Sequence, residues 1–145
     1  MLAYDPSTNP LNNNEWSYPL AECVHIASMA LSIGCIVLVD LRLLGLGIKS
    51  TSAKQLVRDT DLWVIIGLFL AIGTGLLIFS TDPVHFMENG PFQFKMAILL
   101  AGILYNYTLH RSVAFSPSGL APVVALVSIL IWISPIAAGI FSAFV

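Results

Sequence analysis

The chain has 145 residues, of which 57% are hydrophobic and only 10% are charged, and its formal net charge is −2. A soluble domain carries about a quarter charged residues, so this composition excludes a soluble globular protein. Nucleic-acid binding needs a concentrated basic surface, which six scattered Lys and Arg residues do not supply. We therefore expect an integral membrane protein whose main partner is the lipid bilayer.

Residues 1–17 are predicted to form a polar tail at the outer face of the membrane. Three asparagines at positions 12–14 are followed by Trp16 and Tyr18. Amphipathic aromatic rings prefer the headgroup level, so these two side chains predict an interfacial collar.

Four apolar stretches follow, and each is long enough to cross a bilayer. A hydrocarbon core of about 30 Å needs roughly 20 helical residues. The predicted spans are about 18–44, 61–81, 91–110 and 119–143, within one domain covering 18–145. They predict an all-α, up-down four-helix bundle. Four spans leave little room for an extramembrane catalytic domain, so we expect that the chain is not an enzyme by itself.

Local signals refine these boundaries. Gly45 and Gly47 are expected to end the first helix, since glycine is favoured just past a helix end. Ser52 followed by Gln55 fits a capping box that starts a short surface helix before Asp61. Pro135 lies inside the last span and predicts a kink there.

Basic residues determine the expected orientation. Five of the six Lys and Arg residues lie in the two loops that follow the first and third spans, and only Lys95 lies on the other side. By the positive-inside rule both loops are cytoplasmic. We therefore expect a protein of the bacterial cytoplasmic membrane with both termini in the periplasm.

The first and second spans carry the patterns most typical of a site. At 100° per residue, His25, Ser28, Ser32 and Cys35 share one face of the first helix, which is expected to face the bundle. Gly75 lies four residues after Ala71 on the second helix, and such small-residue spacing lets a backbone or a flat ligand approach closely.

Soft and borderline donors gather on the predicted outer side. They are two histidines and three methionines, namely His25, His85, Met29, Met87 and Met96. Thioether and imidazole ligands favour copper, so this set is one candidate metal site.

A b-type haem is the other candidate ligand, because a neutral imidazole beside a glycine-lined wall suits it. The residues for such a site are His25, His85, Lys95 and Gly75. A histidine on an apolar helix can also serve only as a hydrogen-bonded packing residue, so a protein without any ligand is a third alternative.

Polar residues on the inner side are interpreted as structural. Asp40 is expected to pair with Arg42 or to accept a hydrogen bond from Asn106. His110 and Arg111 belong to the same side. Pairing of this kind neutralises charge where helices reach the headgroups.

Several segments carry a resemblance to known proteins. The segments HIASMALSIG (25–34) and DLRLLG (40–45), together with Thr74-Gly75, PFQFK (91–95) and Asn106, are similar to a widespread family of small four-helix bacterial inner-membrane proteins of unknown function. The first helix more distantly resembles the membrane domain of copper-resistance D-type proteins. The first likeness implies a fold and no reaction.

These observations lead to one functional hypothesis with two alternatives. The chain is expected to be an accessory or anchor subunit of a membrane complex that holds a b-type haem for electron transfer. Contacts with other membrane subunits, or with a second copy, are expected through the second and fourth helices. The alternatives are a copper-handling permease and a structural membrane protein without ligand.

Overall fold

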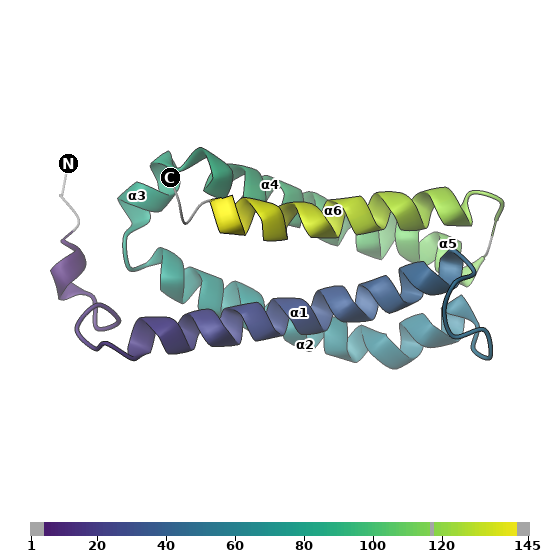
Figure 1. The fold of residues 1–145 in the computed structure, drawn as a ribbon, viewed down its shortest axis with the longest axis horizontal. Helices are drawn as coiled ribbons and strands as arrows, with labels where there is room; N and C mark the ends of the chain where they lie inside the picture. The colour runs from purple at the N-terminus through teal and green to yellow at the C-terminus, as the bar shows by residue number, and fades with distance from the viewer. Residues whose placement is uncertain (1–4, 117, 142–145) are drawn as a thin grey trace.

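The structure is a computed structural model that describes residues 5–116 and 118–141. These residues form helices and loops, with no β-strand among them, which confirms the all-α prediction. Four long helices lie along the longest axis of the molecule, and each runs opposite to the one before it (Figure 1). They are α1 (Ser17–Leu43), α2 (Ala53–Phe79), α4 (Gly90–Tyr105) and α6 (Ala121–Phe141).

The described chain contains more helices than the four predicted. A 3-10 turn, η1 (Pro6–Thr8), precedes α1, and α3 (Pro83–Glu88) lies between α2 and α4. After α4 the backbone passes directly into a π-helical turn, η2 (Asn106–His110), and then into α5 (Arg111–Phe115). The third predicted helix is therefore divided by a change of helix type, although its helical backbone continues to residue 115.

Three helices, α1, α2 and α6, are each long and apolar enough to cross a bilayer. Their outward faces are apolar as well, since Phe69 is 77% exposed and Leu130 is 67% exposed. In water such faces would be costly, whereas in lipid they are the expected surface. These features are those of a multi-pass membrane protein.

The long helices form two antiparallel pairs. The most extensive contacts join α1 to α2, the next join α4 to α6, and α1 with α6 connects the two pairs. Between the pairs lies an apolar cluster that includes Ile33, Ile36, Val64, Leu68 and Trp132. A second cluster of buried residues fills the end of the bundle nearest α5.

Helix ends follow local capping chemistry. Gly45 has a φ of +76°, and the N–H of Leu46 donates to the Leu41 carbonyl at 2.9 Å, which closes α1 as a Schellman motif. Ser52 accepts from the N–H of Gln55 at 3.1 Å, which is the serine half of the predicted capping box, whereas the Gln55 side chain donates to Asp59 at 2.7 Å. The separate surface helix predicted there is wrong, because α2 starts at Ala53 and runs unbroken into the span.

Two asparagines attach the N-terminal segment to the α2–α3 turn. Asn9 Nδ2 donates to the Ser80 carbonyl at 2.7 Å, and Asn12 Nδ2 donates to the Thr81 carbonyl at 3.1 Å. The segment therefore lies across one end of the bundle (Figure 1). Residues 1–4 of the expected tail, and 142–143 of the last predicted span, lie outside the described residues.

Glycines mark where the helices come closest. A Cβ on Gly67 of α2 would clash with Ser32 Oγ and would lie 2.7 Å from the Ser28 carbonyl oxygen of α1. A Cβ on Gly102 of α4 would lie 3.0 Å from Ile131 of α6. Among the glycines of α2, Gly67 therefore lies closest to α1, about one helical turn before the predicted Ala71 and Gly75 pair.

Candidate functional site

His25 lies on α1, half-buried against α2. Its Nδ1 lies 2.8 Å from the Ala71 carbonyl oxygen and 3.2 Å from the Thr74 hydroxyl. A carbonyl only accepts, so we assign the proton to Nδ1, which donates to Ala71. In a neutral imidazole Nε2 then keeps its lone pair. Metal-ligating histidines are commonly held in this way, by an N–H bond from the other ring nitrogen to a carbonyl.

Gly75 makes room for this imidazole. A Cβ at Gly75 would lie 3.1 Å from His25 Cε1, so a larger residue would press on the ring. Glu22 of α1 and Lys95 of α4 are close enough to interact electrostatically with His25. The structure therefore brings together three of the four residues predicted for a haem site.

His85 and two of the methionines are placed differently. His85 is exposed on α3, with its ring 5.9 Å from that of Phe86. Met87 is 61% exposed and Met96 is 47% exposed, whereas Met29 packs against the interior apolar cluster. Within the described residues, no three His, Cys, Asp or Glu side chains group to hold a metal ion.

A second polar cluster lies toward the other end of α1. Asp40 has no exposed surface, and its Oδ1 lies 2.7 Å from Nε2 of His110. Ser128 of α6 donates to Asp40 Oδ2 at 2.9 Å. Asp40 thus joins α1, η2 and α6, and these side chains link the two helix pairs. The serine donates to the carboxylate and not to the imidazole, so the geometry is not that of a serine nucleophile.

The partners expected for Asp40 are therefore replaced by others. Arg42 Nε donates to the Thr51 carbonyl at 2.5 Å, in the loop that follows α1. Two residues along a helix correspond to about 200°, so Arg42 and Asp40 lie on different faces. Asn106 is buried beside His110 on η2, where it lines a cavity.

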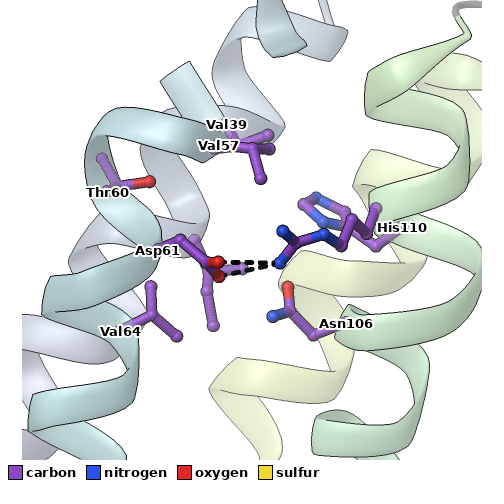
Figure 2. Close-up of a pocket in the computed structure, with 9 residues that line it drawn as sticks. Val39, Val57, Thr60, Asp61, Val64, Asn106 and His110 are labelled. Atoms are coloured by element: carbon purple, nitrogen blue, oxygen red, sulfur yellow. Dashed lines mark hydrogen bonds and ion pairs between the residues drawn. The ribbon is translucent and has the colours of Figure 1, made fainter. Parts of the chain in front are cut away.

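That cavity lies between the buried Asp40–His110 pair and a more accessible ion pair, Asp61 with Arg111. It has a volume of about 20 Å³ and is lined by residues of α1, α2, η2 and α5, including Thr60, Asp61, Asn106 and His110. Both carboxylate oxygens of Asp61 accept from Arg111 at 2.9 Å, as the dashed lines in Figure 2 show. The side chains of Asp61 and Arg111 are 26% and 36% exposed, so this ion pair reaches the surface.

Sequence reasoning missed Ser128 and the π-helical turn. Ser128 follows the buried face of α6, since Val124, Ala125 and Trp132 are buried at helical spacing around it. That periodicity could have identified it as inward-facing. We find no sequence signal for the π-helical turn, which brings Asn106 and His110 to the same cavity.

Comparison with known proteins identifies a family for this chain. A sequence profile for a family of unknown function, DUF6644, matches residues 17–145. The chain belongs to this family. The DUF6644 region starts at the first residue of α1 and contains both polar clusters, whereas the segment that crosses the α2–α3 turn precedes it. No curated protein and no solved structure matches the chain.

Proposed function

We propose that this protein is a membrane anchor subunit that holds a b-type haem through Nε2 of His25. The observation that carries the proposal is the fixed imidazole: Nδ1 is bound to the Ala71 carbonyl at 2.8 Å, and the ring packs against Gly75, where a Cβ would lie 3.1 Å from Cε1. Haem iron is bound by a histidine whose coordinating nitrogen has a free lone pair. The haem would supply one-electron transfer.

Two surrounding features suit such a ligand. Lys95 provides a cation near His25 that can pair with a haem propionate. At the same end of the bundle, α4 and α6 border an open groove of about 510 Å³ lined mainly by small and apolar residues such as Gly90, Ala137 and Ala138. A flat apolar macrocycle needs a surface of this kind.

Copper handling has less support from the geometry. A copper site needs its donors to converge, but Met87, Met96 and His85 are exposed while Met29 packs inside. The distribution of these side chains therefore favours haem over copper.

The anchor role follows from the exposed apolar faces. Only 22% of the apolar stretch of α2 is buried, compared with 33% for α1 and for α6. Of these three helices α2 therefore has the largest exposed share of its apolar stretch, which is available for lipid or a partner subunit, and α6 has an apolar face exposed as well. We propose that a complex in the bacterial cytoplasmic membrane assembles on these two helices.

The proposed orientation places the α5 end of the bundle in the cytoplasm. Five of the six Lys and Arg residues lie at that end or in the α1–α2 loop beside it. A reporter that works only in the cytoplasm should be active when it is fused at Ser52. A reporter that works only in the periplasm should be active when it is fused after Val145. The opposite pattern in both fusions would reverse the orientation.

Substitution of the two outer histidines tests the ligand. We expect His25→Ala to abolish the Soret band of the purified protein, because its ligand to the iron is lost. His85→Ala is the matched control at the same end of the bundle, and we expect it to retain the band. If His25→Gln retains the fold and every bound ligand, the imidazole is a packing residue and the proposal fails.

A further inference from the structure

We infer that three cations at the α5 end of the bundle bind the phosphate group of an anionic phospholipid. The cations are Lys54 and Arg58 of α2 and Arg111 of α5, and all three lie against the ring of Phe115. Binding at this site needs no haem, so it does not depend on the proposed function.

The ring of Phe115 gathers the three positive groups. Lys54 Nζ lies 5.6 Å from the ring centroid, and the guanidinium carbons of Arg58 and Arg111 lie 5.8 Å and 5.5 Å from it. A cation within about 6 Å of an aromatic centroid is attracted by the ring. Lys54 and Arg58 are four residues apart and so share one face of α2. The fold therefore concentrates positive charge where α2 meets α5.

Carboxylates neutralise only part of this charge. Asp61 accepts two hydrogen bonds of 2.9 Å from Arg111, as Figure 2 shows. Asp59 accepts from a glutamine side chain at 2.7 Å and lies about 100° around α2 from Arg58. Among the described residues, Lys54 and Arg58 form no ion pair, and both are exposed. Like charges four residues apart on a helix repel each other, so a bound anion would stabilise the cluster.

The cluster has N–H donors suited to a phosphate. Arg111 donates to Asp61 through Nη1 alone, and within 5–116 and 118–141 its Nε and Nη2 make no hydrogen bond. A guanidinium forms paired hydrogen bonds to phosphate oxygens, and a lysine ammonium adds a compact positive charge. Basic pockets beside transmembrane helices bind lipid headgroups in this way.

The position of the cluster along α2 matches the headgroup layer of a membrane. From Leu62 to Phe79, α2 has no ionisable side chain. This stretch rises about 27 Å, close to the roughly 30 Å of a hydrocarbon core. Arg58 and Lys54 lie about one and two helical turns before it, at the level of the lipid phosphates.

An exposed apolar stripe continues from the cations along α2. It consists of Leu62, Ile65 and Phe69, which are all exposed. At 100° per residue, these side chains lie within the same sector of about 80° as Lys54 and Arg58. A free phosphate ion would use only the cations, whereas a phospholipid would use the cations and the stripe. The continuity of the two surfaces therefore favours a lipid.

Native mass spectrometry of the detergent-purified protein tests the site. Dioleoyl phosphatidylglycerol and dioleoyl phosphatidylcholine have the same acyl chains and a phosphate, but only the first has a net negative charge. We expect the wild type to bind phosphatidylglycerol at least about tenfold more tightly, because two basic side chains have no ion-pair partner. Equal affinity for the two lipids would overturn the proposal, and this comparison needs no variant.

Arg58→Gln locates the binding site. We expect it to weaken phosphatidylglycerol binding about fivefold, the typical contribution of one basic side chain at an anionic membrane. Lys49→Gln is the matched control, because it removes one charge from the α1–α2 loop and leaves the three cations at Phe115 in place. We expect a smaller loss in the control. Equal losses in the two variants would mean that net charge alone attracts the lipid, and the site would be wrong.

Thermal unfolding distinguishes a lipid from other anions. We expect phosphatidylglycerol to raise the Tm of the wild type more than that of Arg58→Gln, because a ligand stabilises the state that binds it. Inorganic phosphate should raise the Tm no more than chloride does at equal ionic strength. Stabilisation by inorganic phosphate as large as that by the lipid would overturn the lipid assignment. Displacement of the lipid by an equal concentration of poly-glutamate peptide would indicate an acidic protein partner and would also overturn it.

Discussion

Replacing Gly67 by alanine should lower the stability of the bundle by about 1–3 kcal/mol, as expected for overpacking of a close helix contact. The new Cβ would lie 2.7 Å from the Ser28 carbonyl oxygen, which belongs to the backbone and cannot rotate away. It would also meet Ser32 Oγ, whose hydroxyl donates to the Val64 carbonyl at 3.0 Å. Both α1 and α2 must therefore shift. Unfolding of the detergent-solubilised protein by heat or by a denaturing detergent measures the effect.

Gly73 provides the matched control on the same helix. A Cβ at Gly73 meets no atom within 4 Å, so Gly73→Ala adds helix propensity without a clash. Alanine is favoured over glycine by about 1 kcal/mol within a helix. We expect Gly73→Ala to be as stable as the wild type or more stable. Equal stability of the Gly67 and Gly73 variants would show that α1 and α2 are not in close contact at Gly67.

Removing the Asp40 carboxylate should have the largest effect of any single polar substitution. Asp40→Ala leaves the buried His110 and Ser128 without their shared acceptor. Leaving a buried donor without an acceptor typically costs about 1–3 kcal/mol for each donor, and Asp40→Ala leaves two. We expect a loss of this size in the same unfolding measurement, whereas Ser128→Ala, which removes one neutral donor, should cost about 1 kcal/mol.

A double variant separates lost pairing from lost packing. In Asp40→Leu with His110→Leu, both ionisable groups are replaced by apolar ones of comparable size, and such replacements are often neutral or stabilising. We expect this variant to recover most of the stability lost in Asp40→Ala. A double variant as unstable as Asp40→Ala would mean that the site depends on its shape and not on the pairing.

Hydropathy and capping residues predicted the parts of the fold that depend on nearby sequence. The apolar stretches of α1, α2 and α6, the stop at Gly45 and the cap at Ser52 all depend on interactions within a few residues. The start of α4 at Gly90 is likewise set by Asn89, whose side chain accepts from the Phe92 N–H at 2.9 Å.

Contacts between distant segments could not be predicted in the same way. His110 is 70 positions from Asp40, and Ser128 is 88 positions from it. Their meeting depends on how α6 is rotated against α1 and on the extra residue of the π-helical turn. The inward face of His25 was predicted from the helical wheel, but its bond to the Ala71 carbonyl depends on the register between α1 and α2.

One absorption spectrum tests the central claim of this account most directly. The wild-type protein, expressed with haem available and purified in mild detergent, is measured across the visible range together with its iron and copper content. The fixed imidazole of His25 predicts a Soret band with iron in a constant ratio to protein, lost in His25→Ala. Iron-free protein without a Soret band, or copper in its place, would contradict the proposed role as a haem-holding membrane anchor.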